Sequence, residues 1–252
     1  MDKEEIVLQK HLKDLAERSY QNNMFTFSGF LSLPQQDLLY SMQSELSYVP
    51  FSLFGGNDCC ERKMVRFGAK EILGYNEEYP IMCVKVMPLI EKFADEFTHR
   101  DFLGAIMNLG IERSTIGDII LDGKKAYVFC MNQIASFMME QLEQVKHTHM
   151  KCEIVLDDIA FSGKEPVEKE IIVTSVRIDV IISKLYNISR NQSLQLFSAK
   201  KVFVNGRSQE SNSYMLKESE SVTVRGYGKF DYLGIRYATK KEKICIAILQ
   251  YV

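Results

Sequence analysis

The sequence predicts an α+β protein built of three small domains, and three observations support this prediction. The chain has 252 residues and 46% hydrophobic content, which is enough to form folded cores. Segments with helical periodicity alternate with short strand-like segments. Stretches that carry glycine, proline or charge separate these segments near residues 74–78 and 157–167. We therefore expect an N-terminal α+β domain at residues 1–78, a central domain at 79–165 and a C-terminal domain at 172–252.

The N-terminal domain is expected to contain two helices and a short strand. Residues 4–18 have helical periodicity, and Pro34 stands where a second helix can begin. The apolar face of this second helix would be formed by Leu38, Leu39, Met42 and Leu46. Residues 54–58 (FGGND) have the composition of a loop, and residues 63–67 are predicted to form a strand.

The central domain is predicted to be a ferredoxin-like or RRM-like split βαβ sandwich with one extra helix. Its expected order is β-α-α-β-β-α-β, with strands at 81–87, 118–121, 125–130 and 150–156 and helices at 88–97, 98–110 and 133–144. Pro88 and the capping pattern of Thr98 and Asp101 indicate two helix starts, and Asp122-Gly123 favours a hairpin. This order of elements is typical of that sandwich.

The C-terminal domain is predicted to have two short helices followed by a small twisted sheet. The first helix would run from residue 174 or 175 to about residue 186. A capping box that starts at Ser189 opens the second helix, which would end near residue 198. Strands are expected at 202–204 and 221–225, and Asn205-Gly206 predicts a tight turn after the first of them.

Charge is distributed unevenly along the chain, although the net charge is only −2. From Ile172 to the end there are 13 Lys or Arg and 6 Asp or Glu, a balance of +7, whereas residues 1–171 have a balance of −9. This asymmetry indicates that the C-terminal third meets a polyanion. A chance imbalance would explain the counts alone equally well.

Cations of the C-terminal domain cluster where an RNA backbone could bind. Arg177 and Lys184 are seven residues apart on one face of the first predicted helix, and Arg190 lies beside the N-terminus of the second, which attracts phosphate. The candidate RNA-binding residues are Arg177, Lys184, Ser189, Arg190, Lys200, Lys201, Asn205 and Arg207, with secondary contacts from Arg100, Arg113, Arg225 and Lys229. Such a surface favours the backbone of structured RNA, and solvated surface charge is the alternative for each member.

Asp179 lies within this predicted basic face and would repel phosphate. We therefore expect a structural role for its carboxylate, which would pair with a neighbouring arginine or favour the first helical turn.

The C-terminal motifs resemble those of the S4 domain. They are residues 177–179 (RID), 189–190 (SR) and 200–207 (KKVFVNGR), and their order and spacing over about 30 residues carry the resemblance. Further stretches resemble the YlmH family of S4-domain proteins along nearly the whole chain. These are 54–56 (FGG), 61–63 (ERK), 99–105 (HRDFLGA), 108–113 (NLGIER), 116–119 (IGDI), 225–230 (RGYGKF) and 239–241 (TKK).

The resemblance implies a bacterial, ribosome-associated protein that binds rRNA or tRNA on the large ribosomal subunit. The family is linked to ribosome quality control, in which stalled subunits that carry peptidyl-tRNA are rescued, and it has an older label of cell-division protein. A protein factor is a further candidate partner. The family usually has glycine at the position of Lys200 and a Gly-Asp pair at Ser219-Glu220, so two turns are expected to be made differently here.

Catalysis, metal binding and cofactors are not expected. Residues 99–101 (HRD) resemble a kinase catalytic loop, but position 106 is Ile where that loop has Asn. No G-x-G-x-x-G follows a predicted strand, no C-x-x-C pair occurs, and His147 and His149 lack a nearby third ligand. The first twenty residues lack the apolar segment of a signal peptide and no long apolar run occurs, so we expect a cytoplasmic protein without membrane contact. We also expect a monomer.

Two other functions remain open from the sequence. One is an RNA-modifying enzyme whose activity resides in the central domain. The other is a protein-interaction module linked to cell division.

Overall fold

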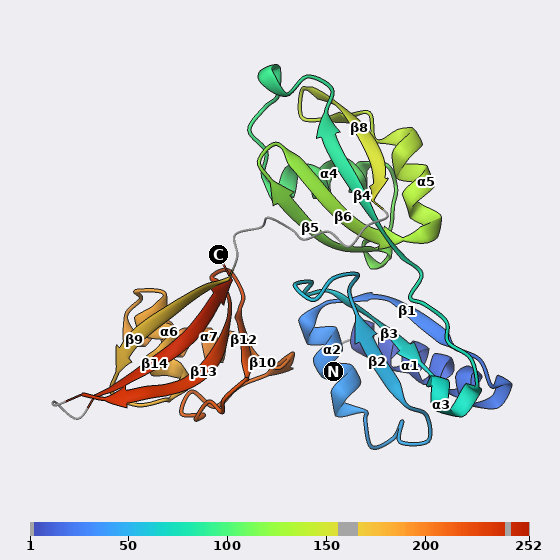
Figure 1. Ribbon diagram of the computed structural model, residues 1–252. Coiled ribbons are helices and arrows are strands. Elements are labelled where there is room, and N and C mark those ends of the chain that lie inside the picture. The colour runs from blue at the N-terminus through green and yellow to red at the C-terminus, as the bar shows by residue number, and fades with distance from the viewer. Residues whose placement is uncertain (1–2, 156–165, 240–242, 252) are drawn as a thin grey trace. The chain divides into compact units, whose positions relative to one another are not determined.

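The computed structural model describes residues 3–155, 166–239 and 243–251 (Figure 1). Helices make up 32% and strands 36% of the protein, which confirms the α+β prediction. The chain divides into two compact units, residues 1–163 and 164–252. Most of the expected connection at 157–167, and residues 240–241 of the TKK stretch, lie outside the described residues.

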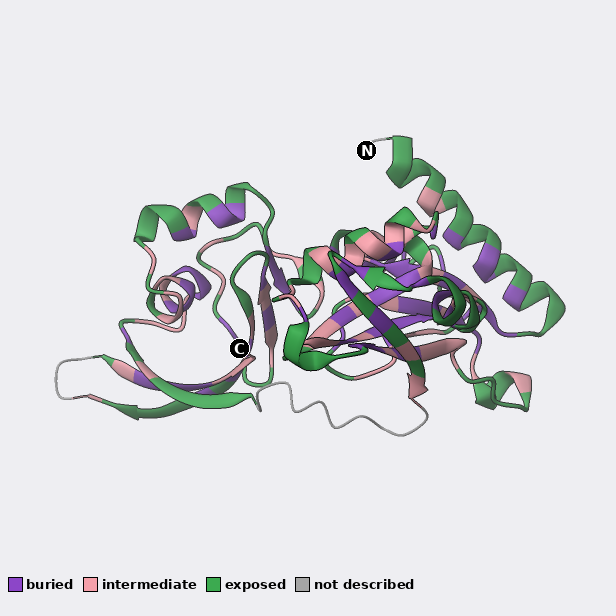
Figure 2. Ribbon diagram, turned by 90° about the horizontal axis from the view of Figure 1, so that it is seen from above, coloured by how far each residue is buried: buried purple, intermediate pink, exposed green. Residues whose placement is uncertain are grey.

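The first unit begins with a three-stranded antiparallel sheet of order β1-β3-β2 that packs against helices. Its elements are α1 (Lys3–Asn22), β1 (Thr26–Leu31), α2 (Leu33–Ser41), β2 (Phe51–Phe54), β3 (Lys63–Phe67) and α3 (Lys70–Leu73). The helix at 4–18 and the strand at 63–67 are thus confirmed. Pro34 lies in the first turn of α2. Ser32 is the N-cap of this helix and forms a capping box with Gln35. Figure 2 shows α1, at the end marked N, exposed along most of its surface with buried residues recurring along it.

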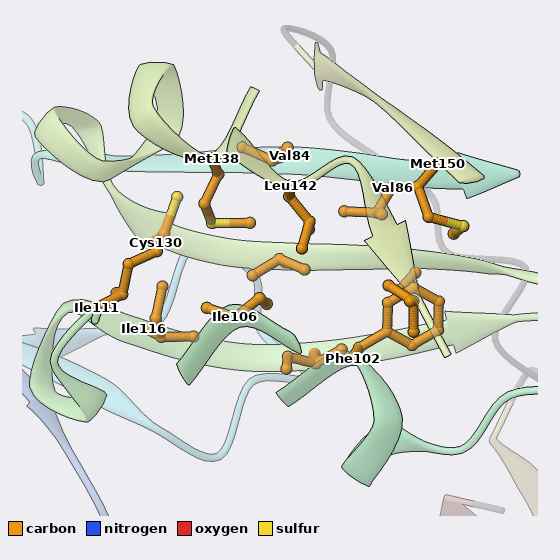
Figure 3. Packing of buried hydrophobic residues seen from close by; sticks show 14 of the residues in the cluster. Val84, Val86, Phe102, Ile106, Ile111, Ile116, Cys130, Met138, Leu142 and Met150 are labelled. Carbon is orange, nitrogen blue, oxygen red and sulfur yellow. The ribbon is translucent and has the colours of Figure 1, made fainter. Parts of the chain in front are cut away.

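The second part of the first unit is an antiparallel sheet of order β5-β6-β4-β8-β7. Its elements are β4 (Ile81–Pro88), η1 (Glu91–Phe93), α4 (His99–Asn108), η2 (Arg113–Thr115), β5 (Ile116–Asp122), β6 (Lys125–Met131), α5 (Asn132–Gln141), β7 (Gln144–Val145) and β8 (Thr148–Val155). The four long strands have the order of the predicted split βαβ sandwich. Figure 3 shows side chains of α4, α5 and one sheet face, among them Phe102, Met138 and Val84, packed in a single core.

The prediction of a helix at residues 88–97 is wrong. Pro88 is the last residue of β4, paired with Met150, and the chain beyond it forms only the short 3-10 helix η1. The backbone N–H of Leu89 donates to His149 O at 3.0 Å, and that of Asp95 donates to the hydroxyl of Thr148 at 3.0 Å. These bonds hold the segment against β8 and leave too few free residues for a regular helix.

The second unit is a six-stranded antiparallel sheet of order β11-β10-β12-β13-β14-β9 with two helices packed on it. Its elements are β9 (Val167–Val173), α6 (Ile178–Leu185), α7 (Arg190–Ser198), β10 (Val202–Val204), β11 (Arg207–Ser208), β12 (Ser221–Val224), β13 (Gly228–Ala238) and β14 (Ile244–Tyr251). The core joins residues of both helices, such as Ile182 and Phe197, to residues of the sheet, such as Val222, Phe230 and Ile246. The expected helix at 189–198 and the strands at 202–204 and 221–225 are confirmed.

The first helix of this unit starts later than the sequence predicts. Arg177 has an extended backbone and forms a β-bridge with Met215, and Val176 O accepts a hydrogen bond from Leu216 N at 3.2 Å. The helix therefore begins at Ile178, and Arg177 is its N-cap residue and does not lie on the helical face with Lys184. This long-range pairing overrides the local capping signal at residues 174 and 175.

Two turns adopt left-handed backbone conformations without glycine. Lys200 has φ of 51° and Ser219 has φ of 68°, in the region that glycine occupies at the lowest steric cost. Lys200 and Ser219 therefore make these turns in a conformation that glycine favours, although both carry a Cβ atom. The turn predicted at Asn205-Gly206 is confirmed, with φ of 51° and 79° between the paired residues Val204 and Arg207.

Replacing Ser219 by glycine should stabilise the second unit by about 1 kcal/mol, since the substitution relieves the steric cost of the left-handed conformation. Ser219 is exposed, so few packing contacts are lost. Thermal unfolding of the full chain should show a higher melting temperature for S219G. S219A is the control because it keeps the Cβ atom, and an equal gain in both variants would contradict this explanation.

Candidate nucleic-acid interface

A buried ion pair fixes the start of α6. The side chain of Asp179 is fully buried, and its carboxylate accepts two hydrogen bonds from Arg177, from Nε at 3.0 Å and from Nη2 at 3.0 Å. This bidentate geometry compensates for removing the carboxylate from water. The hydrogen bond to Asp179, followed by the charge of that carboxylate, raises the pKa of Arg177. The expected pairing of Asp179 with a neighbouring arginine is thereby confirmed.

Short polar contacts fix how α7 follows α6. The hydroxyl of Ser193 is buried and donates to Asp179 O at 2.9 Å, and the hydroxyl of Ser183 donates to Ile188 O at 2.7 Å. Ser189 caps α7: its hydroxyl accepts from Gln192 N at 3.2 Å, while its own N–H donates to the Gln192 side chain at 2.9 Å. The side chain of Ser189, a candidate RNA contact, therefore already has a structural role, and the cap sets Arg190 in the first turn of α7.

A groove of about 600 Å³ lies beside α6 and brings several of the predicted cations together. It is lined by Arg177, Lys184 and Arg190, and by Lys243, which precedes β14. None of its lining residues is acidic, and Lys184, Arg190 and Lys243 make no ion pair within the described part of the chain. We call the groove lined by these four residues the α6 groove. The last three of them give it positive charge beside the N-terminal turn of α7.

Lys243 was missed by the sequence analysis. It lies at the end of a lysine-containing stretch at 240–243 (KKEK), which is the signal that could have drawn attention to it. Its position beside α6 depends on the pairing of Ile244 with Val173, which joins β14 to β9. Sequence spacing does not reveal this pairing, because the two residues are far apart in the chain.

The remaining candidates of the second unit lie at the other end of α7. Lys200 and Lys201 follow this helix, whose nine residues correspond to about 13 Å. Lys200 Nζ is 3.0 Å from the Glu210 carboxylate, and both side chains are exposed, so the pair is weak. Asn205 supports its own turn by accepting from Ser221 N at 2.9 Å, and Arg207 is exposed in β11. The eight candidates thus form two separate groups.

The two secondary candidates of the first unit differ in their surroundings. Arg100 is exposed near the start of α4. The guanidinium of Arg113, in contrast, donates to the carbonyls of Ile116 and Gly117, and burial lowers its pKa. Arg113 therefore stabilises the local turn, and these hydrogen bonds occupy donors that an RNA contact would need.

The sheet face opposite α4 and α5 is partly covered by the N-terminal part of the first unit. Phe129 is only 3% exposed and packs with Cys60 and Cys83, and a Cβ atom at Gly56 would overlap with its ring. Tyr127 is half-buried, with Lys85 Nζ 5.9 Å from its ring centroid. Of the two alternating aromatic residues that could stack on bases in an RRM-like sheet, Phe129 is therefore already covered.

Arg62 and Asp118 hold this cover in place. The carboxylate of Asp118 accepts the backbone N–H groups of Glu61 and Arg62. The guanidinium of Arg62 donates to Phe30 O at 2.7 Å and to Ile116 O at 3.2 Å. Burial raises the pKa of Asp118 and lowers that of Arg62 to about 10. These charge-assisted bonds connect the two sheets of the first unit.

Two domain families match the chain. Residues 75–157 match the family described as "Putative RNA-binding domain in YlmH", and residues 176–222 match the S4 domain. The chain carries a YlmH RNA-binding domain and an S4 domain. The resemblance inferred from the motifs is confirmed, and the chain is an RNA-binding S4 protein.

Two known proteins extend this comparison. The chain is 27% identical over 235 residues to the ribosome-associated protein quality control protein P2 of Bacillus subtilis (strain 168), which covers 92% of this chain and 88% of that protein. The structure of the cell division protein YlmH from Streptococcus pneumoniae matches with a TM-score of 0.52 and 15% identity, over 62% of this chain and 93% of that one. At this identity the second match concerns the fold alone.

Among the described residues, no three His, Cys, Asp or Glu side chains converge to hold a metal ion. None of the helices in the described ranges has the length and apolar character needed to cross a membrane.

Removing Arg62 should destabilise the first unit, because the R62A substitution leaves buried carbonyls without their charged donor. We expect a loss of about 3 kcal/mol, the magnitude typical of hydrogen bonds to charged groups. Thermal unfolding of the full chain is the measurement. Arg100, which is exposed, supplies the control: R100A should change the stability by less than about 0.5 kcal/mol. Equal effects of the two substitutions would argue against the role given to Arg62.

We expect the main role of Arg177 to be stabilisation of the second unit, and its contribution of positive charge to be secondary. R177A leaves the buried carboxylate of Asp179 unpaired, so the melting temperature should fall markedly. The double variant R177A/D179N should melt higher than R177A alone, because the uncompensated charge is removed. R190A removes an exposed cation and should melt like the wild type; a decrease as large as that of R177A would contradict this distinction.

Proposed function

We propose that this chain is a non-catalytic protein that docks on structured rRNA or tRNA through the α6 groove. The observation that carries the proposal is the convergence of Arg177, Lys184, Arg190 and Lys243 on one groove without an acidic lining residue. Phosphate groups of RNA complement this charge, and the N-terminal turn of α7 adds a favourable helix dipole. Contacts of this type position a protein on a folded RNA without reading its sequence.

The proposed setting is the large ribosomal subunit in the cytoplasm, in quality control of stalled peptidyl-tRNA. The name of the Bacillus subtilis relative, which matches over most of both chains, supports this setting. The first unit would then contact another part of the ribosome or a protein factor, since residues 1–171 carry a net charge of −9. Two matched RNA-binding families support a binding role over a catalytic one.

Neutralising the groove should weaken RNA binding and its dependence on salt. We expect R190A/K243A to lower the slope of log K against log salt concentration by about one unit per lost phosphate contact. Arg177 is left in place because of its bond to Asp179. The measurement is the affinity for a structured RNA, such as a folded tRNA, at several salt concentrations.

The matched control removes the same charge elsewhere in the second unit. Lys169 and Lys217 are exposed and do not line the groove, so K169A/K217A should keep most of the wild-type slope. An unchanged slope in R190A/K243A, or an equal decrease in both variants, would overturn the assignment of the groove. Sucrose gradients with the same variants test the setting: the wild type and the control should migrate with large subunits at low salt, and R190A/K243A should remain at the top.

A further inference from the structure

The hairpin between β12 and β13 presents an exposed aromatic ring outside the α6 groove. Arg225, Gly226 and Tyr227 connect Val224 and Gly228, which pair across the hairpin. Tyr227 is 43% exposed, although burial of its largely apolar ring would be favourable. The exposed ring of Tyr227 is therefore available to contact a bound molecule.

The ring of Tyr227 is held from within the unit. Its centroid is 5.3 Å from that of Tyr186, the C-cap residue of α6, and the ring planes are tilted by 51°. The Tyr186 hydroxyl is buried and has no hydrogen-bond partner among the described residues. Gly226 and Gly228 have φ of 89° and 127°, conformations that favour glycine and define the tip. A ring supported in this way loses little conformational entropy when a ligand stacks on it.

Cationic residues surround the same tip. The backbone N–H of Arg225 donates to Lys201 O at 2.9 Å, which places the hairpin next to the segment that follows α7. Lys201 and Arg225 are exposed, and neither forms an ion pair within the described ranges. On the next strand, Lys229 Nζ lies 4.8 Å from the ring centroid of Tyr251. The hairpin tip thus carries exposed cations for which the described residues supply no carboxylate partner.

We propose that Tyr227 is a stacking platform for an unpaired nucleotide of the RNA bound by the α6 groove. The inference rests on the proposed function and adds a contact to a base. The base would lie on the exposed part of the Tyr227 ring, while its phosphates meet Lys201 and Arg225. Every nucleobase has a flat aromatic face, so this site accepts unpaired nucleotides of any sequence. An apolar protein surface would match the ring but not the surrounding charge, which favours a polyanion.

The site lies near the proposed interface along the chain, because α6 carries a residue of each. Lys184 of the α6 groove is in the last turn of α6, and Tyr186 is the residue that caps this helix. A folded RNA that contacts the groove can therefore reach the hairpin with an adjacent loop or bulge. Fully paired RNA presents no free base, and it would use the groove alone.

The test compares two RNAs of equal length, a hairpin with an unpaired loop and a blunt duplex, bound to the full chain. Y227L should weaken binding of the hairpin RNA roughly 5- to 100-fold, as loss of one stacked base does, and leave binding of the duplex within about twofold. Y227F keeps the aromatic face and should bind both RNAs like the wild type. A 2-aminopurine base in the loop should be quenched by the wild type and Y227F, but not by Y227L.

The outcomes separate this inference from the proposed function. Equal effects of Y227L on hairpin and duplex, or equal behaviour of Y227L and Y227F, would overturn the stacking platform. If R190A/K243A still weakens binding of both RNAs in that case, the groove assignment stands. Wild-type binding of both RNAs by R190A/K243A would instead overturn the proposed function. Y227L retains a large apolar side chain against Tyr186, and its melting temperature checks that the unit is folded.

Discussion

The buried carboxylate of Asp179 is the constraint on which the candidate RNA surface depends. A charge that is fully removed from water must be compensated, and Arg177 supplies two hydrogen bonds in bidentate geometry. Because this pair is nearly neutral as a unit, the positive character of the α6 groove depends on Lys184, Arg190 and Lys243. Arginine has five N–H donors, and its side chain here is 34% exposed, so part of the guanidinium still faces solvent. Arg177 can thus contribute directed donors, while the other three contribute net charge.

Local sequence motifs were sufficient to predict the elements that are stabilised by bonds within a few residues. The capping box at Ser189 and Gln192 predicted the start of α7, and Asn205-Gly206 predicted its hairpin, since both motifs satisfy backbone groups within a few residues. The groove was predicted only in part. Arg177, Lys184 and Arg190 belong to neighbouring segments, whereas Lys243 joins them through the pairing of β14 with β9. The start of α6 was misplaced for the same reason, because Met215 and Leu216, far along the chain, pair with the residues before the helix.

The first unit shows how packing changes the meaning of a sequence pattern. Tyr127 and Phe129 alternate along β6 as base-stacking residues do in an RRM-like sheet, yet Phe129 packs against Cys60 from the N-terminal part. Arg62 and Asp118 fix that contact by bonds between segments that are about 50 residues apart. The fold of the central domain could therefore be inferred from the order of its elements, but the accessibility of its sheet could not. The family description of residues 75–157 points to RNA binding. On the same strand as Phe129, Tyr127 is half-buried, and Lys85 Nζ lies 5.9 Å from its ring centroid.

Phosphate contact and base contact make different demands on a protein, and α6 connects the two in the second unit. Phosphate binding tolerates flexible lysines, because charge acts at a distance, whereas stacking requires a ring held at a defined position. Ile178, Ile181 and Ile182 are fully buried and anchor α6 on the sheet. The helix has eight residues, a length of about 12 Å, so the distance between its N-cap Arg177 and its C-cap Tyr186 is fixed by regular geometry. If both proposed contacts form, a rigid spacing between a cationic groove and an aromatic tip would select RNAs by where an unpaired nucleotide lies relative to a paired backbone. Shape, more than sequence, would then determine which RNA this unit binds best.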